Sequence, residues 1–259
     1  MTSRSANPVN GVLVELNEVS FIRSGTAYLD GASLALRPDG RTIIVGPNGS
    51  GKSLLMRIAH GLLKPTHGRV DTGRPDGSPL RQAMVFQRPV LLRRSAQANV
   101  IHALALAGIP RRSRREHADH ALASFGLSRV AHRPARILSG GEQQRLALAR
   151  AWALEPEILF LDEPSSALDP AATKAVEDGV NTFHARGTKI VMVTHDLGQA
   201  RRLADDVVFM CCGQIIERTP ASRFFSTPVT AAAAGFLRGE LILDTGPPAS
   251  GRGDGGASF

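Results

Sequence analysis

Short apolar runs alternate along the chain with longer segments in which apolar residues recur at helical spacing. The runs predict strands at residues 12–16, 42–45, 83–86, 158–162, 190–194 and 207–210. The helical patterns cover residues 52–63, 140–153, 171–186 and 198–205. Strands that alternate with helices favour a mostly parallel sheet with helices packed against its faces. We therefore predict an α/β fold.

Two stretches interrupt this alternation, and both ends of the chain lack it. Residues 89–138 are rich in Ala, Leu and Arg and contain no convincing strand, so we expect an all-helical insertion. Residues 69–80 are rich in Gly, Pro and Asp, which favours a surface loop. The polar N-terminus (1–11) and the Gly- and Pro-rich C-terminus (246–259) are expected to form tails without a core of their own.

The composition is that of a globular protein large enough to bury a full core. Of the 259 residues, 42% are hydrophobic and 21% are charged. A membrane-spanning helix needs roughly 18 apolar residues, and the longest apolar runs, at 100–109 and 231–237, are too short. The N-terminus also has no signal-peptide core. We expect a cytoplasmic protein.

The formal net charge of +8 is scattered along the chain rather than gathered in one stripe, so we expect no nucleic-acid partner. Arginine clusters at residues 93–94 and 111–115 form either a solvated helix face or a contact with anionic lipid head groups. Cys211 and Cys212 follow an apolar run, and we expect two buried or half-buried side chains there. Two cysteines supply neither a disulfide framework nor a zinc site.

A glycine-rich segment between the predicted strand 42–45 and the helix that follows it matches the phosphate-binding loop pattern in full. It consists of Gly46, Pro47, Asn48, Gly49, Ser50, Gly51, Lys52 and Ser53. The successive N–H groups of such a loop form a nest for phosphate oxygens. Lys52 is placed to reach the β- and γ-phosphates, and the Ser53 hydroxyl is placed to bind Mg²⁺. We therefore predict that the chain binds a nucleoside triphosphate with Mg²⁺.

The apolar run 158–161 ends in two carboxylates, Asp162 and Glu163. Ligands of open α/β sheets bind at the carboxyl ends of the strands, so both side chains are expected near the phosphates. We expect Asp162 to hold Mg²⁺, through a water molecule, and Glu163 to polarise the attacking water as general base. An acidic strand end alone is a weak signal, but the phosphate-binding loop upstream strengthens it.

Two further strands deliver polar side chains to the same edge. Gln87 follows the strand at 83–86, where its amide can bind Mg²⁺ or orient water; the alternative is an ordinary surface glutamine. His195 follows the strand at 190–194 and is expected to contact the γ-phosphate rather than to serve a structural role. We count Gln87, Glu163 and His195 as the catalytic candidates.

Residues 138–145, Leu-Ser-Gly-Gly-Glu-Gln-Gln-Arg, predict a second anion site at the start of a helix. Ser139 and Glu142 form the capping-box pattern that opens a helix. Gly140 and Gly141 leave the N–H groups there uncovered, so that an anion can approach the positive end of the helix dipole. Two phosphate sites in one chain suggest a nucleotide that is shared between two chains.

Together these motifs resemble the nucleotide-binding subunit of ATP-binding-cassette (ABC) transporters, and the likeness runs from residue 12 to residue 217 with all motifs in order. It implies a P-loop NTPase core of RecA type with a small antiparallel β part and an inserted helical subdomain. By this likeness one ABC ATPase domain covers residues 12–245. Its catalytic core is expected at 12–88 and 155–245, and its helical subdomain at 89–154.

The resemblance also implies roles for the motif residues. Ser139, Gly140 and Gly141 match the family signature, which contacts the γ-phosphate of ATP bound to the partner subunit. Gln87 matches the Q-loop, residues 166–169 match the D-loop, and His195 matches the switch histidine. On this basis ATP is the expected nucleotide, and the chain is expected to hydrolyse it.

Two positions depart from the family pattern. The family usually places an aromatic ring against adenine where this chain has Arg23, with Phe21 and Tyr28 nearby in the sequence. An arginine plane can also stack on a ring, so we expect Arg23 to contact the nucleotide. Leu54 stands where many such loops carry a second hydroxyl, and one phosphate contact would then be missing.

The resemblance implies partners as well. Two copies are expected to dimerise head-to-tail on two ATP molecules and to separate after hydrolysis. The motion would pass to an integral membrane permease docked beside Gln87 and the helical insertion, with a substrate-binding protein as an indirect partner. The subunit would then lie peripherally on the inner face of the cell membrane.

The cargo is suggested by segments near that permease contact. Residues 86–94, 194–206 and 236–241 are similar to bacterial tungstate importers, and phosphate importers are the next most similar. A soluble ABC ATPase acting on DNA or ribosomes is disfavoured, because a long coiled-coil insertion, metal-binding cysteines or a second cassette would be expected. A regulator without hydrolysis is disfavoured by the presence of Glu163 and His195.

Overall fold

A computed structural model describes residues 11–72 and 78–240. Within them nine strands form two sheets: β1 (Val14–Arg23), β2 (Thr26–Leu36), β3 (Arg41–Val45), β4 (His67–Thr72), β5 (Gln82–Val85), β6 (Ile158–Asp162), β7 (Lys189–Val193), β8 (Asp206–Cys211) and β9 (Gln214–Pro220). The predicted tails at 1–11 and 246–259 lie outside these residues apart from Gly11.

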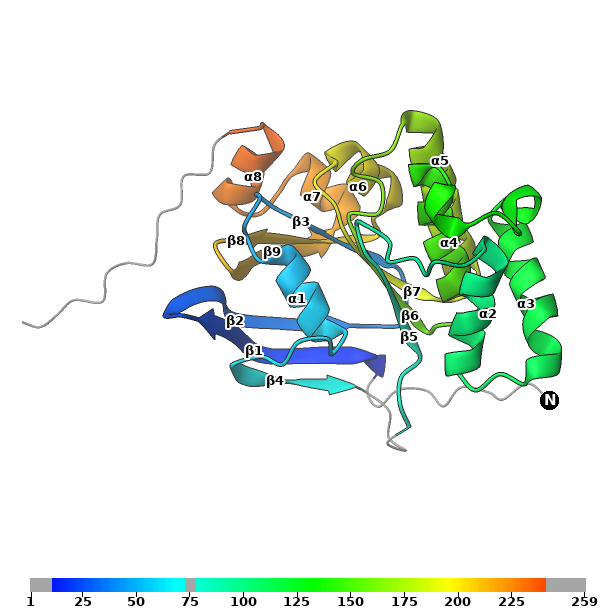
Figure 1. The fold of residues 1–259 in the computed structure, drawn as a ribbon. Coiled ribbons are helices and arrows are strands. Elements are labelled where there is room, and N and C mark those ends of the chain that lie inside the picture. The colour runs from blue at the N-terminus through cyan, green and yellow to red at the C-terminus, as the bar shows by residue number, and fades with distance from the viewer. Residues whose placement is uncertain (1–10, 73–77, 241–259) are drawn as a thin grey trace, which may run out of the picture.

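Along the chain, the helices alternate with strands or follow the last strand, and Figure 1 labels each of them. They are α1 (Lys52–Ala59), α2 (Ala96–Leu106), α3 (Arg111–Ser124), α4 (Gly140–Trp152), α5 (Pro170–Ala185), α6 (Leu197–Leu203), α7 (Ala221–Ser226) and α8 (Ala231–Leu237). Short 3₁₀ turns occur at Ser128–Val130 and Ala135–Ile137. None of the helices in the described residues is long and apolar enough to cross a membrane.

The main sheet has the strand order β5-β6-β7-β3-β8-β9, and all its neighbours are parallel except β8 and β9. Every residue of β6 and of β7 is buried. A parallel strand covered on both faces reads as a continuous apolar run, which explains why the sequence identified β6 and β7 so directly. This sheet confirms the predicted α/β fold with a mostly parallel sheet.

The two faces of the main sheet pack against different layers. Ile43 and Val45 belong to the core that α2 to α8 cover, whereas Ile44, between them on β3, belongs to the core shared with α1 and the second sheet. Leu159 and Phe160 on β6 divide in the same way. Because successive side chains of a strand point to opposite faces, one short run builds both cores.

The second sheet is antiparallel, with the order β2-β1-β4. The prediction of a loop over 69–80 is wrong at its beginning, because Arg69–Thr72 completes β4. The sequence pattern does not predict this strand, because its residues are almost all exposed and backbone pairing with β1 holds it in place. β2 and β9 were also missed, since about half of their residues face solvent.

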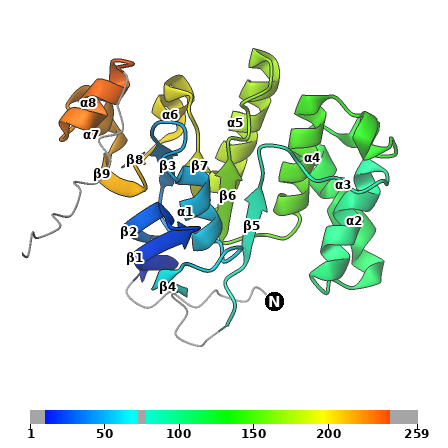
Figure 2. The same cartoon turned by 60° about the vertical axis from the view of Figure 1, so that its left-hand side comes forward.

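The predicted helical insertion is present as α2 and α3 with the two 3₁₀ turns, followed by α4. Figure 2 shows α2, α3 and α4 grouped beside β5, on the side of the main sheet away from β9. Apart from the isolated bridge between Ser95 and Pro134, the described part of this stretch makes no strand pairing. Ser95 caps α2 by accepting a hydrogen bond from the N–H of Ala98.

Candidate functional site

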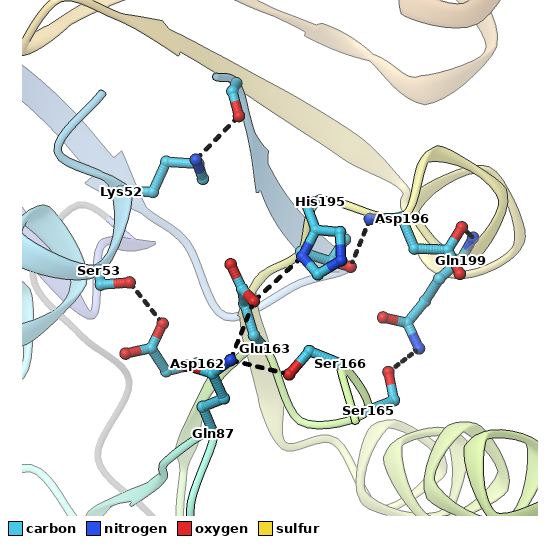
Figure 3. Close-up of polar contacts among 12 residues, drawn as sticks. Lys52, Ser53, Gln87, Asp162, Glu163, Ser165, Ser166, His195, Asp196 and Gln199 are labelled. Carbon is cyan, nitrogen blue, oxygen red and sulfur yellow. Dashed lines mark hydrogen bonds and ion pairs between the residues drawn. The ribbon is translucent and has the colours of Figure 1, made fainter. Parts of the chain in front are cut away.

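The carboxyl ends of neighbouring parallel strands place the predicted residues at one edge of the main sheet. β3 runs into the segment that begins at Gly46, and β5 leads to Gln87. β6 ends at Asp162, with Glu163 directly after it, and β7 leads to His195. Figure 3 shows Gln87 and His195 pointing toward Glu163, and Asp162 pointing toward Ser53.

Close backbone packing accounts for two glycines of the loop. A Cβ on Gly46, whose φ is 149°, would lie 2.0 Å from the carbonyl oxygen of Met210 on β8. A Cβ on Gly51, whose φ is 93°, would lie 2.9 Å from the carbonyl oxygen of Tyr28. The loop therefore packs tightly between the start of β2 and the end of β8. Gly51 has no side chain to cap α1, which leaves the first N–H groups of that helix available to an anion.

Lys52 turns back over the loop instead of extending into solvent. Its ammonium donates hydrogen bonds to the carbonyl oxygens of Gly46 at 2.8 Å and Pro47 at 2.7 Å. Burial lowers the pKa of Lys52, while the nearby carboxylates of Glu163 and Asp162 act in the opposite direction. The side chain thus holds a positive charge close to the loop, where phosphates would bind.

Ser53 and Asp162 form an oxygen pair beside the loop. The Ser53 hydroxyl donates a hydrogen bond of 2.6 Å to one carboxylate oxygen of Asp162. The other carboxylate oxygen lies 3.4 Å from a guanidinium nitrogen of Arg57. Asp162 is 4% exposed, so its charge is held among partners rather than in water. Hydroxyl and carboxylate oxygens are ligands that Mg²⁺ prefers.

Glu163 lies at the centre of the polar contacts. Its carboxylate oxygen is 3.0 Å from Nδ1 of His195 and 3.5 Å from Nε2 of Gln87. Gln87 also donates a 3.0 Å hydrogen bond to the hydroxyl of Ser166. The backbone of Glu163 has a φ of 46°, a left-handed conformation uncommon for this residue type, and its N–H bonds to the carbonyl of Val193. Strain of this kind is typical of functional sites.

The signature residues lie in a different hollow. The predicted capping box is present: the Ser139 hydroxyl accepts from the N–H of Glu142, and the Glu142 carboxylate accepts from the N–H of Ser139. Ser139, Gly140 and Gly141 line a space of about 410 Å³ together with the segment 167–169 and with Ala171 and Ala172. A Cβ on Gly141 would lie 2.7 Å from that of Ala172, so this glycine also permits the close approach of α4 and α5.

The phosphate-binding loop lines its own pocket of about 300 Å³. The lining residues are Tyr28, Asn48, Gly49, Gly51, Lys52, Ser53, Leu54, Arg57 and Glu163. Among the described residues Arg23 does not line this pocket; it pairs with Thr26 where β1 meets β2. Tyr28, half exposed, is the aromatic residue that does.

Sequence reasoning gave no role to Arg57 and none to Ser166 on its own. Arg57 lies four residues after Ser53 on α1, and this spacing places both on one face of the helix. That signal was available in the sequence. The contact between Ser166 and Gln87 depends on how the turn after β6 packs, and no local sequence pattern predicts this contact.

Comparison with known proteins identifies the family of the chain. The model of the ABC transporter family matches residues 29–166. A phosphate import ATP-binding protein of Natronomonas pharaonis is 37% identical over 243 residues, covering 86% of each chain. A tungstate uptake system ATP-binding protein of Peptoclostridium acidaminophilum is 35% identical over 196 residues, covering 74% of this chain and 92% of that protein.

A solved structure is similar over most of its length. It is a dimeric ATP-binding cassette in a post-hydrolysis state with ADP and phosphate, with a TM-score of 0.70 and 29% identity. The match covers 80% of this chain and 98% of that one. Family match, relatives and fold agree with the P-loop core identified above. The chain therefore belongs to the ABC transporter family as an ATP-binding, ATP-hydrolysing subunit.

Proposed function

We propose that this subunit hydrolyses ATP at sites formed between two copies of itself. The observation that carries the proposal is that the two predicted anion sites line separate pockets of one chain. The phosphate-loop pocket holds Lys52 and Glu163, whereas Ser139 and its glycines line the signature hollow. A second copy arranged head-to-tail would bring its signature hollow over the first copy's phosphate loop. Each ATP would then be held by both chains.

The donor set beside the loop fits Mg²⁺. The described residues contain no group of three or more His, Cys, Asp or Glu side chains suited to holding a metal ion. Mg²⁺ does not require such a cage, because it is usually bound by one or two carboxylates together with substrate phosphates and water. The Ser53 hydroxyl, the Asp162 carboxylate and the Gln87 amide oxygen would hold the ion, which would neutralise phosphate charge.

We assign the chemistry to Glu163, His195 and Gln87. Glu163 would accept the proton of the attacking water as general base, since it lines the same pocket as the phosphate-binding loop. His195, bonded to Glu163, would contact the γ-phosphate oxygens. Gln87 would orient the water.

The nucleotide itself would be held by other residues. Gly46 to Ser53 would hold the phosphates, and the aromatic ring of Tyr28 would stack on adenine in place of the expected Arg23.

A groove beside β5 is our candidate for the permease contact. It has a volume of about 260 Å³ and lies between β5 and α4, and its lining includes Phe86 and Pro89, which lie close to Gln87 in the sequence. Its lining includes the exposed side chains of Leu62 and Val90, which are 49% and 74% exposed. Apolar groups left in solvent at a groove favour a protein partner. An integral membrane permease docked there would hold the subunit on the inner face of the cell membrane.

The division into a catalytic core (12–88 and 155–245) and a helical subdomain (89–154) is part of the same proposal. Its support is that α2, α3 and α4 form a group at one side of the main sheet. Motion of that group relative to the strands would move the groove residues together with Gln87. A conformational change that depends on the bound nucleotide would in this way be transmitted to the permease.

We propose tungstate or a related oxyanion as the cargo. The support is the similarity to a tungstate uptake subunit over 92% of its length, together with the three segments identified in the sequence. Phosphate is the alternative, because the phosphate import relative is 37% identical over 86% of this chain, against 35% over 74% for the tungstate relative. A separate substrate-binding protein would capture the cargo.

The shared site is tested with Ser139→Asp. Asp caps a helix as well as Ser, so α4 should stay folded, but its negative charge would repel a phosphate of the partner's ATP. We expect ATP binding to the isolated chain to be unchanged and steady-state hydrolysis to fall on the order of a hundredfold, the usual effect of losing one phosphate-directed donor. Ser139→Thr, which keeps the hydroxyl, is the matched control. Equal losses of binding and hydrolysis would place both sites on one nucleotide within one chain, and would refute the proposal.

The cargo is tested on the assembled transporter. The subunit, its permease and its substrate-binding protein are reconstituted in lipid vesicles, and ATP hydrolysis is measured with tungstate, molybdate or phosphate outside. Stimulation by tungstate supports the proposal. Stimulation by phosphate alone assigns the alternative.

A further inference from the structure

Two adjacent thiols lie at the end of β8, next to the phosphate-binding loop. Cys211 and Cys212 are the two cysteines of the chain. Cys211 is 8% exposed, and Cys212 is exposed, which corrects the expectation that both are at least half buried. Their sulfur atoms are 3.2 Å apart, so both thiols lie on the same side of the backbone. A reagent from solvent can reach Cys212 first and then Cys211.

The geometry of the turn between β8 and β9 does not favour a cysteine. Cys212 has a φ of 50° and Gly213 a φ of 78°, and they connect β8 to β9 as a two-residue hairpin turn. Both central residues of such a turn adopt left-handed conformations, which favour Asn-Gly. Cys212 therefore carries backbone strain that Asn or Gly would relieve. Turn geometry does not explain a thiol at this position.

The turn is attached directly to the nucleotide site. The N–H of Gly213 donates a hydrogen bond of 3.3 Å to the carbonyl of Ser50 in the phosphate-binding loop. The carbonyl of Gly213 accepts a bond of 3.1 Å from the N–H of Asp30 on β2. A Cβ on Gly213 would lie 2.9 Å from the carbonyl oxygen of Tyr28. The turn cannot shift without moving the loop or the strand that carries Tyr28.

The spacing of the sulfurs indicates which ligand fits. Adjacent Cα atoms are about 3.8 Å apart, shorter than the separation of roughly 4.4–6.8 Å that disulfides prefer. A tetrahedral metal needs further protein ligands, and the described residues offer no group of three His, Cys, Asp or Glu around these thiols. If its bonds to sulfur are about as long as a zinc–thiolate bond, about 2.3 Å, an atom that bridges sulfurs 3.2 Å apart has a sulfur–atom–sulfur angle of roughly 90°. That angle suits a pyramidal trivalent arsenic atom.

We propose that Cys211 and Cys212 form a dithiol site for trivalent arsenicals, and that its occupancy weakens ATP binding through the adjoining phosphate-binding loop. With phenylarsine oxide, two arsenic–sulfur bonds form while the arsenic–oxygen double bond is lost. The two thiol protons leave with that oxygen as water. Arsenic stays trivalent, and no oxidant or reductant is needed. The bridge fixes the two side chains in one ring and adds a bulky phenyl group to the turn that is hydrogen-bonded to Ser50.

The site is tested by treating the full chain with phenylarsine oxide in excess 2-mercaptoethanol, followed by intact-mass measurement. We expect one phenylarsenic group per chain, which resists the monothiol and is removed by ethanedithiol. Cys211→Ser and Cys212→Ser should each lower the affinity for the reagent by about a hundredfold or more, because two linked contacts become one. Labelling that is unaffected by either substitution, or that is lost in the monothiol, would overturn the site.

The coupling is tested by ATP titration of labelled and unlabelled protein. We expect labelling to weaken ATP binding by about tenfold, equivalent to about 1.4 kcal/mol, and ethanedithiol to restore it. Cys212→Asn is the matched control: Asn suits the left-handed turn position, so this variant should bind ATP normally whether or not the arsenical is present. Labelled protein that binds ATP as tightly as unlabelled protein would overturn the coupling.

Discussion

Replacing Glu163 with glutamine separates binding from chemistry at the site. Glutamine has the same shape but cannot accept the proton of the attacking water. The substitution leaves Lys52, Ser53 and the loop backbone untouched, so we expect ATP to bind with unchanged affinity. In the proposed dimer, ATP that is bound but not hydrolysed would keep two copies together.

The size of the effect follows from the position of the side chain. Loss of a positioned general base lowers turnover by about 10²–10⁴-fold, or about 3–5 kcal/mol of activation free energy. The contact with His195 contributes little to stability, because the histidine side chain is 53% exposed and even an exposed ion pair contributes at most about 1 kcal/mol. Unfolding of the variant is therefore not expected, and a large loss of turnover can be attributed to catalysis.

The assay combines steady-state phosphate release, calorimetric ATP titration and sedimentation with ATP and Mg²⁺. We expect Glu163→Gln to show the stated loss of turnover, normal ATP affinity and a stable dimer. Glu155→Gln is the matched control, because Glu155 also has a left-handed backbone, with a φ of 47°, but does not line the phosphate-loop pocket. Turnover within about threefold of the unsubstituted protein would refute the base assignment, and a purely monomeric variant would refute the ATP-bridged dimer.

Two further predictions concern buried lysines. Lys52→Ala should weaken ATP binding by about a hundredfold, because a charge-assisted phosphate contact is worth about 1.5–3 kcal/mol; unchanged affinity by calorimetry would contradict the phosphate-loop assignment. Burial lowers the pKa of Lys189 from 10.5 to about 8, so between these pH values the unfolded chain binds more protons and the free energy of unfolding should rise with pH. Measured by urea unfolding against Lys189→Met, the rise should be on the order of 3 kcal/mol. A difference in unfolding free energy between the two proteins that does not change with pH would contradict the prediction.

Sequence patterns predicted the buried strands well and the exposed ones poorly. β6 was predicted at the residues it occupies, because burial on both faces demands an unbroken apolar run. β4 is nearly all exposed, and its place is fixed by backbone pairing that no side-chain pattern records. α1 ends at Ala59 rather than residue 63, and here the signal was present: Gly61, with a φ of 84°, is the residue type that ends helices.

The convergence of the site residues could be predicted, but their contacts could not. Gln87, Asp162 and His195 lie far apart in sequence, and the rule that parallel strands meet at their carboxyl ends was enough to bring them together. Whether a given side chain points into the pocket depends on local backbone geometry. Arg23 lies beyond the pocket because β1 and β2 meet there as a hairpin, whereas Tyr28, two residues after β2 begins, lines it.

The starts of α1 and α4 satisfy their free N–H groups in different ways, and the difference bears on how the proposed dimer would come apart. α1 follows Gly51 without a side-chain cap, so its N–H groups gain partners when phosphate binds. α4 is capped by Ser139 and Glu142, so it needs no ligand to stay folded. A ligand held by both chains stabilises the dimer only as long as both contacts exist. Loss of the γ-phosphate would remove the contact of the partner's α4 while the loop keeps the diphosphate, and the copies would separate without either helix unfolding.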